Sequence, residues 1–423
     1  MDYTSKTLTN GMRVITVPMP TLESAAITVF VGVGSRFESE KNAGISHFIE
    51  HMAFKGSKTY KTAREVSETI DSMGADYNAA TSKDWTNFFI KSRSHTLEKS
   101  FAVLSDMILD PILDKAEIEK ERGVILEEIK MQEDTPMDKI GDIFMELVFE
   151  GNPLAVDIAG TQKSVKNITR DDFVKFRTQH YYGGNMVITV AGGVHSPDVE
   201  KLAERYFGNV AGGSQEVPLI FSALQDKPKL KVEYKKSEQA HFILGFLGHH
   251  RNYPKRYAEN VLATILGRGM SSRLFHEIRE KRGLAYSVGS SISRFSDTGV
   301  FETYAGVDLK RIDEAIAVML EQHYGIASAQ FPVSNEELKK AKEYMKGRIA
   351  LALEDTVSVC DYFGQRALFM DSIETPEEIF DKIDAVTIDE IYQSASELFK
   401  PEHLNLSVIG PYKDQERFGK LLR

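Results

Sequence analysis

The chain has 423 residues, of which 42% are hydrophobic and 27% charged, so it can form two or three globular domains and is neither disordered nor collagen-like. Its single cysteine, Cys360, excludes an intrachain disulfide and a cysteine-based metal cluster, and the net charge of -10 argues against nucleic-acid binding. No stretch approaches the ~18 apolar residues that cross a bilayer, so no membrane contact is expected. The N-terminal stretch resembles neither a secretory signal nor a transit peptide, which makes the cytoplasm the expected location.

Strand and helix patterns alternate through the first half of the chain. Apolar and alternating runs predict strands at 13–18, 25–34 and 186–191, and two strands within 76–92 joined by a tight turn near Ser82. Apolar stripes at helical spacing predict helices at 42–51, 62–73, 95–109 and 115–131, and a further helix starting at Ser196.

A change in composition near residues 211–228 marks a linker, because glycine, proline and charged residues replace the apolar pattern. We therefore expect an N-terminal domain at 1–212, a linker at 213–228 and a C-terminal domain at 229–423. The second half then repeats the first in outline. Its predicted elements are strands at 242–246, 285–293 and 298–307, and helices at 256–266, 272–281, 311–324 and 335–353.

One pair of segments supports a duplication. Residues 113–131 match residues 333–351 at an offset of 220, with apolar residues at corresponding positions. Two unrelated amphipathic helices would also look alike, but the neighbouring elements follow in the same order. Two copies of one α+β unit is the interpretation that requires the fewest assumptions.

The sharpest local motif is His47-Phe48-Ile49-Glu50-His51, inside a predicted helix. Histidines four residues apart lie on one helical face, so both imidazoles can bind one ion. Glu50 lies beside them and can contact a water molecule bound to that ion. This is the inverted zincin arrangement. The alternative is a pair of surface histidines, although the apolar flanks of the motif favour a partly buried segment.

A third ligand is expected from another element, because a hydrolytic zinc site has three protein ligands and an open position. In the helix 115–131, Glu121 and Glu128 share a stripe with isoleucines. A carboxylate on an otherwise buried stripe needs a metal, a basic partner or a raised pKa. The alternative is that both glutamates lie at the edge of a solvated face.

With these residues in place, the chain resembles the pitrilysin and mitochondrial processing peptidase family of zinc metallopeptidases over nearly its whole length. Glu128 lies 77 residues after His51, where the family has its third ligand. The resemblance implies that one Zn²⁺ per chain is bound by His47, His51 and Glu128, that Glu50 is the catalytic base, and that Glu121 helps to position the catalytic groups.

Two further motifs match this family. The segment Asn78-Ala79-Ala80 resembles the strand whose edge pairs with an extended substrate, a form of β-augmentation. In the second half, Arg279 and Tyr286 match an arginine and a tyrosine that bind the substrate near the scissile bond, where such groups can hold a carbonyl and stabilise an oxyanion.

The resemblance implies an α+β fold class, with two homologous α/β-sandwich domains per chain and two chains closing as a clamshell around a chamber. The partner chain would be a second copy or a paralogue, and the substrate a peptide or an unfolded polypeptide segment. The implied activity is zinc-dependent endopeptidase cleavage. The alternatives are a non-catalytic scaffold subunit and a protein that binds peptides without cleaving them.

Overall fold

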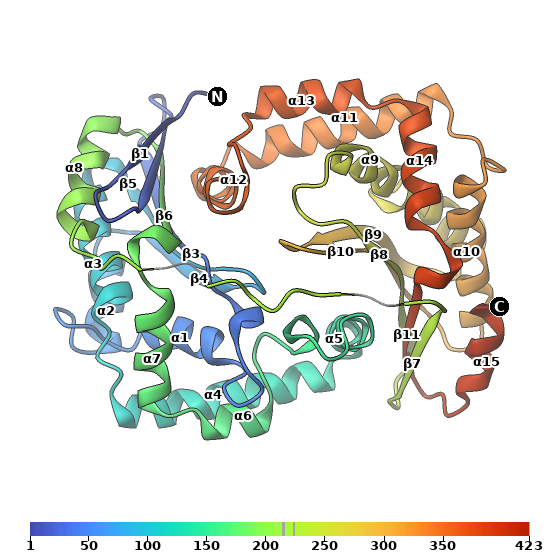
Figure 1. Ribbon diagram of the computed structural model, residues 1–423, viewed down its shortest axis with the longest axis horizontal. Helices are drawn as coiled ribbons and strands as arrows, with labels where there is room; N and C mark the ends of the chain where they lie inside the picture. Colours follow the sequence, from blue (N-terminus) through green and yellow to red (C-terminus); the bar gives the residue numbers. More distant parts are fainter. Residues whose placement is uncertain (214–215, 223–224, 423) are drawn as a thin grey trace. The chain divides into compact units, whose positions relative to one another are not determined.

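The computed structural model describes residues 1–213, 216–222 and 225–422, and it divides into two compact units (Figure 1). Unit 1 consists of Met1–Ile129, Val156–Leu219 and Ala350–Pro376. Unit 2 consists of Lys130–Ala155, Ile220–Ile349 and the chain from Glu377 onward. Compared with the expected domains 1–212 and 229–423, each unit therefore contains one segment from the other half of the chain. Within the expected linker 213–228, residues 214–215 and 223–224 lie outside the described residues.

Unit 1 is built on a six-stranded sheet in the order β1-β2-β6-β3-β5-β4. Neighbouring strands are antiparallel except β2 and β6, which are parallel. The two central strands are buried along almost their whole length, as expected for strands covered on both faces. The outermost strand β4 is paired on one side only among the described residues. The strands are β1 (Thr4–Thr7), β2 (Arg13–Pro18), β3 (Ser24–Val31), β4 (Asp76–Thr81), β5 (Thr86–Arg93) and β6 (Met186–Gly192).

Helices cover both faces of this sheet. Alternate residues of β3, including Ile27 and Val29, join the main core with the helices that follow in the first half. The other face packs against α12 (Thr356–Phe369), where a Cβ added at Gly364 would lie 2.3 Å from the ring of Phe30. This close packing explains why α12 belongs to unit 1. The remaining helices of the unit are α1 (Ile45–Ala53), α2 (Ala63–Asp71), α3 (Leu97–Leu109), most of α4 (Lys115–Asp134), α6 (Gln162–Asn167), α7 (Arg170–His180) and α8 (Ser196–Phe207).

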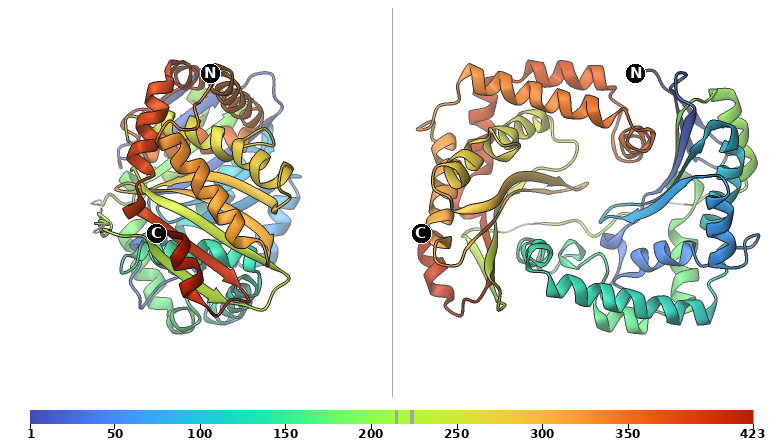
Figure 2. Two further views of the ribbon diagram at one scale, coloured as in Figure 1. Left: turned by 90° about the vertical axis from the view of Figure 1, so that its right-hand side faces the viewer. Right: turned by 180° about the vertical axis from the view of Figure 1, so that it is seen from behind.

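Unit 2 repeats this plan with a five-stranded sheet in the order β7-β11-β8-β10-β9. Its parallel pair is β7 and β11, which Figure 2 shows as a yellow-green strand beside a red one. Helix α5 (Pro136–Val148), from the first half of the chain, packs on this sheet. The strands are β7 (Lys229–Tyr234), β8 (Gln239–Gly248), β9 (Ala285–Arg294), β10 (Gly299–Asp308) and β11 (Leu404–Gly410). The helices are α9 (Arg256–Gly267), α10 (Ile312–Ala327), most of α11 (Asn335–Ala352), α13 (Pro376–Ala385), α14 (Ile388–Leu398), α15 (Gln415–Gly419) and a π-helical turn, η5 (Phe275–Glu280).

The expectation of an α+β chain with two similar α/β units is confirmed. Both sheets end in an antiparallel hairpin whose outer strand, β4 or β9, lies at the edge. The predicted elements up to residue 353 are present with shifted ends, although the helix predicted at 272–281 is the π-helical turn η5. Among the elements before residue 353, β1, α5, α6, α7 and β7 were not predicted. No strand or helix was predicted beyond residue 353, where the structure has α12 to α15 and β11. In the part of the chain that is described, no helix is both long and apolar enough to cross a bilayer.

Candidate metal centre

The histidine motif lies on α1, which begins directly after Gly44. Gly44 has φ +92°, and a Cβ at this position would lie 2.4 Å from the carbonyl oxygen of Ala159. The position therefore requires glycine. Phe48 and Ile49 are buried in the core of unit 1, which turns His47, Glu50 and His51 towards α4 and β4. The predicted helix and its shared histidine face are both present.

Glu128 of α4 completes a three-residue cluster with the two histidines. One ligand atom from each of His47, His51 and Glu128 lies within 4.8 Å of the others. The Nε2 atoms of the histidines are 3.2 Å apart, and Glu128 Oε2 lies 3.8 Å from His47 Nε2 and 3.7 Å from His51 Nε2. Ligands about 2.1 Å from a tetrahedral zinc would be about 3.4 Å apart, so the three groups fit around one ion.

The protonation of the histidines also suits a metal. Burial, with a smaller effect from His51, lowers the pKa of His47 to about 4, so this imidazole is neutral. His51 Nδ1 lies 2.8 Å from Glu121 Oε1. A carboxylate accepts at that contact, so Nδ1 carries a proton and Nε2 is the ring nitrogen that faces His47 and Glu128. The contact with Glu121 thus orients the His51 ring for a metal, and the neutral ring of His47 can bind a cation.

Glu121 is the carboxylate that orients His51, and it has a second partner that the sequence did not indicate. Lys55 Nζ lies 2.6 Å from Glu121 Oε2, and only 8% of the Glu121 side chain is exposed. Burial raises the pKa of Glu121, but the hydrogen bonds from His51 and Lys55 outweigh burial and lower it overall. Glu121 is therefore ionised. Lys55 follows His51 by four residues, and that spacing was the only signal that could have identified it.

Glu50 is held by a residue of the edge strand. Thr81 Oγ1 donates to Glu50 Oε2 over 2.6 Å. Burial raises the pKa of Glu50, while the bond from Thr81 lowers it by less. Thr81, the last residue of β4, was not predicted as a site residue. Its bond to Glu50 places the carboxylate of the motif next to the end of the strand expected to bind substrate.

The residues expected to bind substrate lie on the edge strands β4 and β9 or, for Arg279, on the turn η5 that precedes β9. In β4, Asn78 and Ala80 are exposed and Ala79 is buried, and Asn78 Oδ1 accepts from the N–H of Ala79 over 2.9 Å. In unit 2, Arg279 of η5 donates to the carbonyl oxygen of Tyr286 in β9 over 2.7 Å, and its guanidinium lies 4.9 Å from the centre of the Tyr286 ring. The structure therefore joins Arg279 to Tyr286, with the tyrosine 77% exposed.

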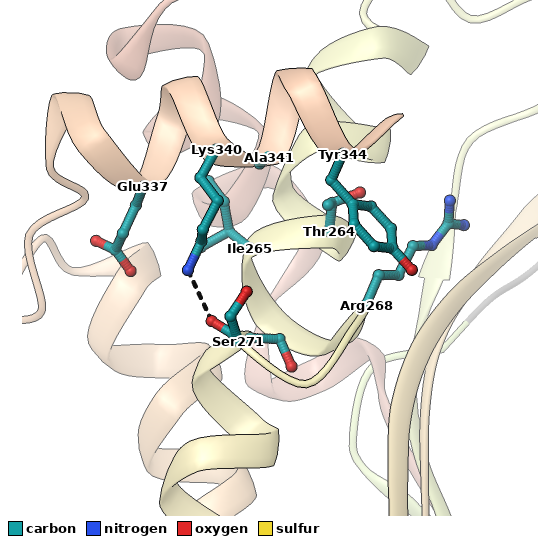
Figure 3. A pocket seen from close by; sticks show the side chains of 9 residues that line it. Thr264, Ile265, Arg268, Ser271, Glu337, Lys340, Ala341 and Tyr344 are labelled. Carbon is teal, nitrogen blue, oxygen red and sulfur yellow. Dashed lines mark hydrogen bonds between the residues drawn. The ribbon is translucent and has the colours of Figure 1, made fainter. Parts of the chain in front are cut away.

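Unit 2 also contains a small pocket between α9 and α11 (Figure 3). Lys340 Nζ donates to the carbonyl oxygen of Ser271 across it over 2.8 Å, and Arg268 and Tyr344 lie at its other end. Its volume of about 20 Å³ has room for about one water molecule. We therefore assign no substrate to this pocket.

Comparison with known proteins identifies two matching family models. Residues 13–162 match the model described as insulinase (peptidase family M16), and residues 167–345 match the M16 inactive domain. His47, Glu50, His51, Glu121 and Glu128 all lie in the first of these stretches.

Several relatives match almost end to end. An uncharacterized zinc protease of Mycobacterium leprae is 34% identical over 99% of this chain and 94% of its own length. An uncharacterized zinc protease of Bacillus subtilis is 34% identical over 96% of this chain and 97% of its own. These names describe proteases that use zinc.

Solved structures share the fold. A protease from Helicobacter pylori has a TM-score of 0.90 at 24% identity, covering 97% of this chain and 99% of that one. A chain of complex III2 from Candida albicans has a TM-score of 0.86 at 20% identity, covering 99% of both. Because its two halves match the family models and its relatives match over nearly their whole length, the chain belongs to peptidase family M16, the family that its sequence resembles.

Proposed function

We propose that this protein is a zinc-dependent endopeptidase that hydrolyses peptides or unfolded polypeptide segments. One observation carries the proposal: His47, His51 and Glu128 converge on one point, and Glu50 lies beside them, bound to the end of β4. Two imidazoles and a carboxylate form a common ligand set of catalytic zinc sites. Bound zinc would lower the pKa of a water molecule and polarise a carbonyl group.

In this proposal Glu50 is the general base. It accepts a proton from the attacking water and delivers it to the leaving amine, so no covalent intermediate forms. The raised pKa of Glu50 suits a group that must both accept and release a proton. Glu121 fixes the ring of His51, and Lys55 keeps Glu121 ionised.

The substrate would lie extended along the free edge of β4. Backbone hydrogen bonds to an edge strand bind a peptide with little dependence on its side chains. Asn78, Ala79 and Ala80 would form that edge, with Asn78 contacting the substrate backbone. Arg279 and Tyr286 would hold a substrate carbonyl and stabilise the developing oxyanion. Two chains, identical or paralogous, would enclose the substrate in a chamber.

A non-catalytic scaffold or peptide-binding role is the alternative. One observation favours it: a chain of the same fold occurs in complex III2 of Candida albicans. Against it, all three ligand positions and the base are present in this chain. Residues that serve only an assembly role have no need for a converging ligand set with a neighbouring base.

The test compares three variants of the purified protein. Glu50→Gln should keep its zinc and lose turnover of a quenched-fluorescence peptide by ~100-fold or more, because the amide cannot accept a proton. Glu128→Gln should lose zinc, measured by elemental analysis. Glu127→Gln is the matched control, since Glu127 is the exposed neighbour of Glu128 on α4.

Zinc-loaded protein that hydrolyses no peptide in a broad panel would refute the peptidase and favour peptide binding alone. Full zinc content in Glu128→Gln would refute the ligand assignment. Wild-type turnover by Glu50→Gln would refute the role of the base while leaving the metal site in place.

A further inference from the structure

The N-terminus of α1 has no capping side chain of its own. Its N-cap is Gly44, which offers no oxygen to the first N–H groups of the helix. These N–H groups have no partner within a helix and need acceptors from elsewhere. The helix that carries His47, Glu50 and His51 therefore depends on an acceptor outside its own sequence.

The buried carboxylate of Glu38 supplies that acceptor. Its Oε2 accepts from the N–H of Gly44 over 2.6 Å, and its Oε1 accepts from the N–H of Ser46 over 2.8 Å. Glu38 is only 7% exposed. Burial raises the pKa of Glu38 to about 7, while the hydrogen bonds from Ser46 and Gly44 lower it by less. The contribution of Glu38 to the start of α1 is therefore its two backbone hydrogen bonds, and not a full negative charge.

The segment that carries Glu38 is fixed to the turn between β4 and β5. The N–H of Ser35 donates to the carbonyl oxygen of Ser82 over 3.1 Å, and the N–H of Arg36 to that of Lys83 over 3.0 Å. Arg36 and Asp84 form a buried ion pair at 3.2 Å, with 1% and 4% of their side chains exposed.

Gly34 permits this contact, because a Cβ there would lie 2.2 Å from the carbonyl oxygen of Ser82. Residues 34–38 are thus bound on one side to the β4–β5 turn and on the other to α1. Thr81, which holds Glu50, immediately precedes that turn.

We propose that Glu38 is a positioning residue for the active site: its carboxylate fixes the start of α1 to the β4–β5 turn and so sets where Glu50 and the histidines lie relative to β4. This inference rests on the proposed peptidase function for its kinetic consequence. The hydrogen bonds of the Glu38 carboxyl group go to Gly44 and Ser46 at the start of α1, so Glu38 acts through that helix.

The test is the substitution Glu38→Gln in the full-length chain. The glutamine keeps the volume of the side chain, but its NH₂ group faces an N–H donor, so one of the two backbone bonds is lost. We expect zinc affinity, measured by chelator competition, to fall about tenfold. We expect kcat to fall about tenfold with KM nearly unchanged, because the base is displaced while the strand edge is intact.

Glu40→Gln is the matched control. Glu40 lies two residues further along the same loop and is exposed, so its loss of charge should leave zinc affinity and kcat unchanged. Hydrogen exchange of the amides of Gly44, Ser46 and Phe48 should accelerate in Glu38→Gln only. If Glu38→Gln does not fold, Glu38→Asp, which retains the carboxyl group, replaces it and should show smaller losses in the same direction.

Wild-type zinc affinity and kcat in a folded Glu38 variant would overturn the inference, even if the melting temperature fell. Equal losses in Glu40→Gln would also overturn it. If the wild-type protein cleaves no peptide, the proposed function fails, but the zinc affinity and amide exchange of the variants still decide the role of Glu38.

Discussion

Replacing Lys55 by methionine tests the electrostatic support of the metal centre. The substitution keeps an unbranched side chain and removes the ammonium group that lies 2.6 Å from Glu121. Glu121 is then a largely buried carboxylate with the ring of His51 as its remaining side-chain hydrogen-bond partner, so its pKa should rise. A weaker negative charge on Glu121 makes His51 a poorer donor to a metal ion.

The size of the effect follows from the exposure of the two groups. Loss of a partner in the outer shell of a metal site costs ~10–100-fold in affinity. Because 26% of the Lys55 side chain is exposed, water replaces part of its interaction, and we expect the lower value. The expected loss is about tenfold, or about 1.4 kcal/mol of binding free energy.

The assay is competition for zinc between the protein and a chromophoric chelator at neutral pH. Lys58→Met is the control, because Lys58 is an exposed lysine three residues further along the chain. A zinc affinity within about twofold of the wild type in Lys55→Met would refute the reasoning. A similar loss in Lys58→Met would show that general charge, and not the contact with Glu121, is responsible.

Two further predictions concern other contacts. Thr81→Val keeps the volume of the side chain but removes the hydroxyl group that donates to Glu50. We expect kcat to fall about tenfold while zinc affinity is unchanged. An unchanged kcat would contradict the role of Thr81. Asp361→Asn tests a pH effect, because burial raises the pKa of Asp361 from 3.8 to about 6. The folded protein therefore holds this proton more tightly than the unfolded chain. Ionisation of Asp361 lowers the stability of the fold progressively as the pH rises from about 4 to about 6, and the whole loss is present above about 6. Thermal melts should show the Asn variant more stable by about 1 kcal/mol at about pH 8, after allowance for solvent screening, and equal to wild type at about pH 4. A stabilisation that is the same at both pH values would contradict this.

Local sequence patterns were sufficient for most elements of the sheets. β3 and β6 are nearly continuous apolar runs, and the structure buries both on two faces. Helices α5 and α12 were not predicted, and no local pattern could have assigned them to their units. An apolar stripe predicts that one face of a helix is buried, but it does not say against which sheet. That choice depends on the fit between side chains, such as that of Gly364 against the ring of Phe30.

The residues of the candidate site were likewise predictable only in part. The spacing of His47 and His51 and the stripe position of Glu128 predict ligands that converge, and the structure brings them together. Lys55 and Thr81 were missed because their partners are distant in sequence. From the sequence alone, a lysine after a helix and a threonine at the end of a strand look like ordinary surface residues. Their roles follow only from the fold, which brings Lys55 to Glu121 of α4 and Thr81 to Glu50 of α1.

The two halves of the chain carry different groups of candidate site residues. Residues 121 and 128 of α4 correspond, at the offset of 220, to Ala341 and Arg348 of α11, so the second copy lacks the acidic groups of the first. It carries Arg279 and Tyr286 instead. If the working form is a homodimer in which this pair completes the site of the partner chain, two inactive variants should complement each other.

Mixing Glu50→Gln with a double variant, Arg279→Ala and Tyr286→Phe, provides the test. In a mixed dimer one site contains both defects and the other contains none. Random exchange makes half of the dimers mixed, so about a quarter of wild-type activity should return for a symmetric dimer. Exchange must first be verified with differently tagged chains. Free exchange without recovered activity would show that each chain completes its own site, because every chain in the mixture carries one defect.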